Sequence, residues 1–223
     1  NKAIGIKNKY NSVKNGGDFL KYKVVNNMNR TGKRSGSKLF LKSKDISNVR
    51  FFNSNLTYFH FKKRVFKNVD FLGCNLKNSV FKNAKFINCI FYNTNLSNSN
   101  FLDAVFINSY FINCKFSGIK NISFNNYNVI NNDFSSLNIP KKLENEIFDL
   151  NRVPAFKRSY VFTTKRSKGT KINKGIVFVL KNDFTDEELV RIFSVINKKT
   201  NSRIKNFITY GQFYEFGLKY LKK

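Results

Sequence analysis

The sequence of 223 residues contains no tryptophan, two prolines, one methionine and one histidine. Acidic residues are also few, because 13 Asp and Glu stand against 41 Lys and Arg, and the formal net charge is +28. No apolar run reaches the roughly 18 residues that indicate a transmembrane helix, so we expect no membrane span. An excess of positive charge repels itself, and it is usually retained where a polyanion neutralises it.

Motifs for catalysis and cofactor binding are absent as well. General acid–base or nucleophilic catalysis needs a cluster of His, Cys or carboxylate groups, and His60 is the single histidine. The acidic group at 183–188 lies at the start of a predicted helix, where the helix dipole explains it. The sequence contains no P-loop, no GxGxxG motif and no metal-ligand spacing. We therefore expect neither an enzyme nor a bound cofactor or metal.

A five-residue period dominates the middle of the chain, where every fifth residue is Phe, Leu or Ile. This period fits neither an α-helix nor a flat strand, whose side chains repeat about every 3.6 and 2 residues. The chain is therefore predicted to turn a corner in each repeat. The large residues are Ile46, Phe51, Leu56, Phe61, Phe66, Phe71, Leu76, Phe81, Phe86, Phe91, Leu96, Phe101, Phe106, Phe111 and Phe116.

Two further positions of the repeat support this interpretation. Small residues recur two positions before the large one, where they would fill a narrow interior. Asn recurs two positions after it, with Gly73, Gly118 and Asp103 as substitutes, and these residue types favour tight turns. The three cysteines, Cys74, Cys89 and Cys114, all take the small position. We interpret them as packing residues of an intracellular protein in a reducing compartment.

The pattern resembles the pentapeptide-repeat family, whose repeats read small, then Asp or Asn, then Leu or Phe, then two variable residues. Clear matches are Cys74-Asn75-Leu76, Thr94-Asn95-Leu96, Ser99-Asn100-Phe101 and Ser54-Asn55-Leu56. The resemblance covers about residues 45–139 and implies a mainly β fold. It implies a right-handed quadrilateral parallel β-helix with four repeats per coil and the large residue on the axis.

The flanks of the repeat are predicted to form three further regions. Residues 1–44 read as a basic, largely extended arm with too little apolar surface to order alone. Residues 140–152 read as a helix that caps the C-terminal end of the β-helix, because Leu143, Ile147 and Leu150 follow helical spacing.

Residues 153–223 read as a small α+β domain. Two β-rich runs, 159–164 and 175–180, are predicted to pair as a hairpin, and 203–210 is predicted as a third strand. A capping box of Thr185 and Glu188 opens a predicted helix, and a final helix is expected from 212 to 221.

Positive charge gathers in the flanks, because residues 1–44, 45–139 and 140–223 carry +11, +6 and +11. The loop of the predicted hairpin holds five bases and no acid, which is typical of a loop that contacts phosphates. The candidate nucleic-acid-binding residues are Arg30, Lys33, Arg34, Lys38, Lys157, Arg158, Lys165, Arg166, Lys168, Lys171 and Lys174.

These features favour a structural component of a ribonucleoprotein assembly, with RNA, chiefly ribosomal RNA, and neighbouring proteins as partners and with DNA second to RNA. By analogy, an organellar ribosome such as that of a mitochondrion is the setting. The alternatives are a DNA- or topoisomerase-associated pentapeptide-repeat protein, or an adaptor that binds an acidic protein. The family resemblance implies duplex-DNA mimicry towards bacterial type II topoisomerases, but that role needs an acidic rod, and this repeat is basic.

Overall fold

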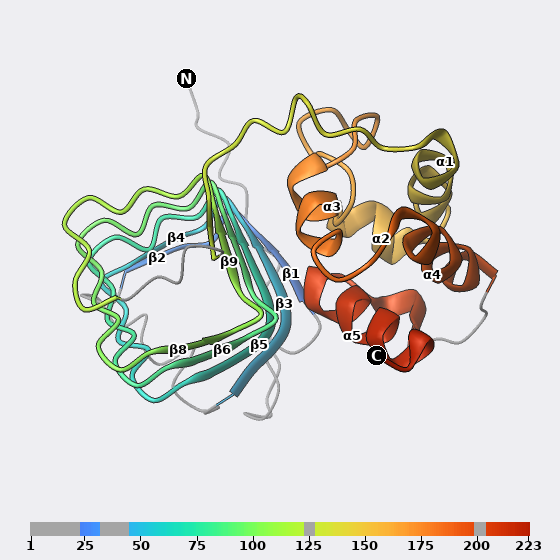
Figure 1. Ribbon diagram of the computed structural model, residues 1–223. Helices are drawn as coiled ribbons and strands as arrows, with labels where there is room; N and C mark the ends of the chain where they lie inside the picture. Colours follow the sequence, from blue (N-terminus) through green and yellow to red (C-terminus); the bar gives the residue numbers. More distant parts are fainter. Residues whose placement is uncertain (1–22, 32–44, 123–127, 199–203) are drawn as a thin grey trace, which may run out of the picture.

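The computed structural model describes residues 23–31, 45–122, 128–198 and 204–223. It consists of a parallel β-solenoid and a helical part that packs against one side of the solenoid (Figure 1). The solenoid is four-sided, as the family resemblance implied. We number its faces by their axial residues: face 1 (Ile46, Phe66, Phe86, Phe106), face 2 (Phe51, Phe71, Phe91, Phe111), face 3 (Leu56, Leu76, Leu96, Phe116) and face 4 (Phe61, Phe81, Phe101).

Strands occupy mainly faces 1 and 2, and successive coils pair in parallel with an offset of 20 residues. The long strands β3 (Asp45–Phe52) and β5 (Val65–Leu72) each run around the corner between these two faces. The shorter strands are β4 (Asn55–Thr57), β6 (Lys85–Ile87), β7 (Ile90–Tyr92), β8 (Val105–Ile107), β9 (Tyr110–Ile112) and β10 (Val129–Ile130).

The axial positions behave as the five-residue period predicts. Phe66, Phe86 and Phe91 are almost completely buried. Rings one coil apart stack, for example Phe66 on Phe86 with centroids 4.8 Å apart, and Phe81 on Phe101 with centroids 4.6 Å apart. Offset stacks of this kind add about 0.5–1.5 kcal/mol per pair beyond the burial of apolar area.

The corners also follow the prediction. The residue two positions after each axial one has a left-handed backbone, with φ between 44° and 65° at fourteen successive corners from Asn48 to Asn113 and at Gly118. Asn and Gly tolerate this conformation best. Tyr58 and Lys63 adopt it as well, in the first complete coil, where the Asn pattern is broken.

The N-terminal boundary of the solenoid differs from the prediction. Strands β1 (Lys23–Asn26) and β2 (Asn29–Thr31) pair in parallel with β3 and β4, so residues 23–31 form part of an additional coil rather than an extended arm. Their offset is 26 residues instead of 20, because Val24 pairs with Arg50. This longer offset hides the coil from a search at the regular period.

The C-terminal boundary differs too. Val129 pairs with Phe111, so the repeat resumes for strand β10. Phe134 and Ile139, which continue the sequence period, pack instead against the hydrophobic cluster of the helical part. The solenoid therefore ends near Ile130, and the predicted limit of 139 is wrong.

The helical part replaces the predicted α+β domain. It contains α1 (Lys141–Leu150), α2 (Pro154–Ser159), α3 (Lys174–Leu180), α4 (Asp186–Lys198), a 3-10 helix (Ile204–Asn206) and α5 (Tyr210–Leu221). The run 175–180, predicted as a strand, is α3, and five of its six residues are buried. An apolar run buried on all sides loses the alternation that separates a strand from a helix. A single antiparallel bridge, Thr163 to Ile172, remains of the predicted hairpin.

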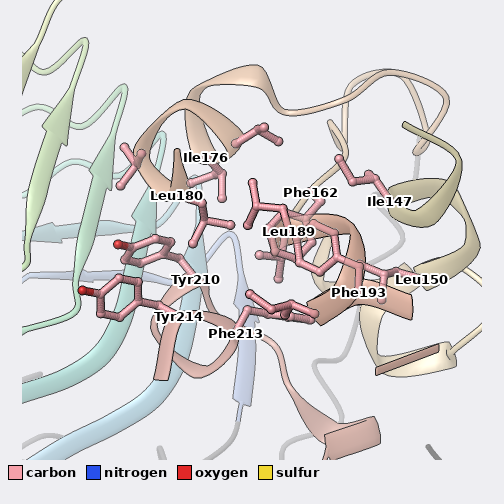
Figure 2. Packing of buried hydrophobic residues seen from close by; sticks show 14 of the residues in the cluster. Ile147, Leu150, Phe162, Ile176, Leu180, Leu189, Phe193, Tyr210, Phe213 and Tyr214 are labelled. Carbon is pink, nitrogen blue, oxygen red and sulfur yellow. The ribbon is translucent and has the colours of Figure 1, made fainter. Parts of the chain in front are cut away.

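Three predictions for the helices are confirmed and one is wrong. Helix α1 lies where expected, α4 begins with the Thr185–Glu188 capping box, and α5 forms the final helix. However, α1 does not cap the solenoid. Its buried residues Leu143, Ile147 and Leu150 belong to the cluster of the helical part, where α1 packs on α4 (Figure 2).

Candidate binding surfaces

Face 2 of the solenoid is consumed by the interface with the helical part. Its outward residues Arg50, Asp70, Ile90 and Ile112 are fully buried, and Tyr110 is nearly so. Figure 2 shows Tyr210 and Tyr214 of α5 side by side, on the side of the helical cluster that faces the strands. Face 2 therefore serves as an internal interface and is not available to a partner.

A buried ion pair stands at the centre of this interface. Arg50 donates to Asp70 from the neighbouring coil, and its second guanidinium nitrogen donates to the carbonyl of Tyr160 at 2.9 Å. The backbone N–H of Tyr210 donates to the same Asp70 carboxylate at 2.9 Å. Burial raises the pKa of Asp70 and lowers that of Arg50, while the charge of each partner opposes the shift. The pair ties α2 and α5 to the solenoid.

A second polar junction lies at the corner between faces 1 and 2. The Glu215 carboxylate of α5 accepts hydrogen bonds from Asn68 at 3.1 Å and from Asn88 at 3.2 Å. It also pairs with Lys67 at 2.9 Å. The corner asparagines themselves form a row in which each amide donates to the one before it, from Asn108 to Asn48.

The predicted nucleic-acid-binding residues fall into three groups. Lys33, Arg34 and Lys38 lie outside the described residues, and Arg30 lies in β2, where its side chain is not described. Lys157 and Arg158 are exposed in the last turn of α2. The remaining five, Lys165, Arg166, Lys168, Lys171 and Lys174, belong to the loop between α2 and α3 or begin α3.

Two of the five loop bases make structural contacts. The amine of Lys165 donates to Asn26 at 2.5 Å and lies 4.8 Å from the centre of the Phe52 ring. The amine of Lys174 donates to the carbonyls of Ser135 and Leu137 at 3.2 and 2.9 Å. Lys165 thus joins the loop to the solenoid, and Lys174 holds the connection to the helical part. Arg166, Lys168 and Lys171 are exposed.

A cationic corner lies on the opposite side of the solenoid, where face 4 turns into face 1. It is defined by Lys62, Lys63, Arg64, Lys82 and Lys85. All are exposed except Arg64, which is partly buried. Lys62 and Lys82 hold the same position in successive coils, which lie about 4.8 Å apart. The coil period of 20 residues, applied to the charged positions, would have revealed this corner from the sequence.

Apolar side chains continue from the cationic corner along face 1. Lys85 is paired with Val105 of the next coil, and Ile87 with Ile107. Val105 and Ile107 are 50% and 44% exposed, which is unusual for large aliphatic residues in the described part of the chain. The surface therefore combines positive charge with exposed apolar area.

A groove of about 800 Å³ lies between the first coils of the solenoid and the helices α2 and α5. Its walls include Asn48 and Lys67 from the solenoid, Arg158 from α2, and Phe216 and Lys219 from α5. No sequence signal indicates this groove, because it exists only where α5 docks against the corner of the solenoid.

Groups of catalytic or metal-binding residues are not found in the described ranges. Among those residues, no three His, Cys, Asp or Glu side chains come together as a metal site. His60 is exposed and paired with Val80 on face 4. None of the described helices has the length and apolar character to cross a bilayer.

Comparisons with known proteins concern the solenoid. A family model described as "Pentapeptide repeats" matches residues 45–83 and 79–118, with 8 copies. The solved structure of full-length QnrB1, described as a plasmid-mediated fluoroquinolone resistance protein, is 18% identical, with 46% of this chain and 48% of that chain covered and a TM-score of 0.38. The pentapeptide repeat protein Rfr23 from the cyanobacterium Cyanothece 51142 is 13% identical, with coverages of 51% and 87% and a TM-score of 0.17.

The match to QnrB1 spans about half the length of that protein. At these identities the likeness concerns the fold alone. No curated protein matches the chain.

Proposed function

Residues 45–118 of the chain are pentapeptide repeats, and on this basis we propose that the protein is a non-catalytic adaptor whose solenoid binds an acidic protein surface. The cationic corner and the apolar strip beside it, Ile87, Val105 and Ile107, would form the contact. The observation that carries the proposal is that a dense cluster of positive charge and the exposed aliphatic residues lie side by side on the same face of the rod.

The chemistry of this surface favours a protein over a nucleic acid. Phosphate backbones are bound by charge and hydrogen bonds and gain nothing from exposed aliphatic side chains. Protein interfaces combine an apolar centre with a charged rim, and complementary charge steers the two partners together. Val105 and Ile107 would supply part of the apolar centre, and the cationic corner would supply the rim.

The ribonucleoprotein interpretation has weaker support. It relied on a hairpin tip with five free bases, but Lys165 and Lys174 are engaged in structural contacts, and the loop connects two helices. Of the remaining candidates, Arg166, Lys168 and Lys171 stay exposed. Nothing in the comparisons relates to RNA, to ribosomes or to mitochondria.

The charge of the rod also separates two routes to a protein partner. Residues 45–122 contain ten Lys and Arg against three Asp and no Glu, so this rod does not imitate the charge of DNA. A topoisomerase, the partner class that the family resemblance implies, would have to be bound through its own acidic surface rather than through its DNA-binding surface.

Site-specific photocrosslinking in cells tests the proposal. A photoreactive residue replaces Lys82 in the cationic corner, and a matched probe replaces Lys168 in the exposed loop. We expect the probe at Lys82 to form adducts with an acidic protein, and these adducts should survive nuclease treatment. Adducts that disappear with nuclease, or that form only at Lys168, would contradict the proposal.

A further inference from the structure

We infer that the groove between α5 and the first coils of the solenoid is a second contact site, and that it binds an extended acidic peptide segment of the same partner. This inference rests on the proposed function. The groove volume of about 800 Å³ falls within the ~300–1,000 Å³ that is usual for ligand sites.

The walls of the groove are rich in hydrogen-bond donors. Asn68 donates to Asn48, which is the last described member of the corner row, so the amide nitrogen of Asn48 remains at the groove wall. Gln212 also lines the groove, and its amide oxygen accepts from the backbone N–H groups of Ile208 and Thr209. The nitrogen of that amide is left as a donor, which suits a ligand that carries acceptor oxygens.

The charges of the groove point the same way. Glu215 is the acidic residue among those that line it, and Lys67, Asn68 and Asn88 already donate to its carboxylate. Arg158 and Lys219 line the groove as well and are both exposed. Arginine binds carboxylates with two parallel hydrogen bonds. The groove therefore offers two cations to an anionic ligand.

The apolar walls favour a peptide over a single-stranded nucleic acid. Phe207 and Phe216 line the groove and are only partly buried, so they can receive an apolar side chain. One face of Phe216 is already stacked on Tyr220 at 6.1 Å with an angle of 3°, which leaves less ring surface for a base. The Glu215 carboxylate would also repel closely spaced phosphates. A peptide can place its carboxylates at Arg158 and Lys219 and avoid Glu215.

Fluorescence anisotropy with a labelled ten-residue peptide of Glu, Asp and Phe tests the inference on the full chain. We expect saturable binding, and Arg158→Glu should weaken it roughly tenfold or more, as expected for the loss of charged hydrogen bonds. The matched control is Lys157→Glu, which makes the same charge change in the same turn of α2 but lies outside the groove lining. It should change the affinity less than twofold. Circular dichroism and thermal melting check that both variants fold.

The other outcomes overturn the inference. Equal weakening by Arg158→Glu and Lys157→Glu would show diffuse charge attraction, and absence of saturation would show no site. Tighter binding of a ten-nucleotide thymidine strand would identify a nucleic-acid groove instead. Failure of the groove and failure of the adaptor proposal are distinguishable, because the crosslinks at Lys82 do not depend on Arg158.

Discussion

Arg50 and Asp70 lie directly opposite each other on the neighbouring strands β3 and β5, and both side chains are fully buried beneath the helical part. Outward-facing positions of a solenoid are normally solvated. Here one coil supplies the cation and the next supplies the anion, and the helical part covers both. The pair therefore marks the position at which the two parts of the chain are locked together.

Breaking this pair should be costly. Asp70→Ala leaves the Arg50 guanidinium buried without its counter-ion, and we expect a loss of about 3–5 kcal/mol in the free energy of unfolding. Urea denaturation followed by circular dichroism measures it. The double variant Arg50→Met with Asp70→Leu should recover most of the loss, because no charge remains buried. If Asp70→Ala is silent, the pair does not hold the interface.

The axial rings should dominate the stability of the solenoid. Phe86→Ala removes a fully buried ring from stacks with Phe66 and Phe106, and we expect a cost of about 3–5 kcal/mol. Phe106→Ala should cost less, since Phe106 is only partly buried. The exposed wall residue Lys77 provides the control, because Lys77→Ala should be almost silent in the same melts. Equal effects at Phe86 and Lys77 would contradict the axial register.

The close approach of α5 to the solenoid should depend on Gly211. A Cβ atom there would lie 2.4 Å from Asn68 Oδ1 and 2.6 Å from the carbonyl of Asn88, which is too close for any contact. Gly211→Ala would normally stabilise a helix by about 1 kcal/mol. We expect the opposite here, a loss of ~1–3 kcal/mol through overpacking. Lys219→Ala, on the exposed side of the same helix, should leave the melting temperature unchanged.

The three cysteines should be inert in the folded protein. Burial raises the pKa of each thiol, Cys74, Cys89 and Cys114, to about 12. Because the thiolate is the reactive form, iodoacetamide at pH 8 should label none of them until urea unfolds the chain. Mass spectrometry counts the labels, and rapid labelling of the native protein would contradict the packing role.

The same shifts give a dependence of stability on pH. Unfolded thiols lose their protons near pH 8.5, whereas the folded thiols keep theirs up to about pH 12. Protons are therefore bound more tightly in the folded state across this range. The contribution of the thiols to stability is complete below about pH 8.5 and declines as the pH rises towards 12.

The solenoid could be predicted from the sequence because each repeat carries its own local signal. The axial ring, the small partner and the Asn corner recur within five residues, and the structure places all three as expected. The coil at 23–31 could not be found this way, since its 26-residue offset breaks the period.

The helical part and the binding surfaces were harder to predict because they depend on contacts between distant residues. Helix α3 is buried on nearly all sides and lacks a periodic pattern, so its β-rich composition misled the prediction. The groove depends on α5 meeting the corner of the solenoid, through contacts such as Glu215 with Asn68. These residues lie 147 positions apart in the sequence. The candidate site in the loop was mistaken because Lys165 and Lys174 find partners that only the folded chain supplies.

The most direct test of the adaptor account is the dissociation constant of the crosslinked partner for two triple variants, measured by isothermal titration calorimetry. One variant replaces Lys62, Lys82 and Lys85 of the cationic corner with Ser, and the other replaces Arg166, Lys168 and Lys171 of the loop with Ser, so each removes three exposed positive charges. We predict that the corner variant weakens binding roughly tenfold or more, while the loop variant binds within about twofold of the wild type. Weakened binding by the loop variant together with unchanged binding by the corner variant would contradict the account.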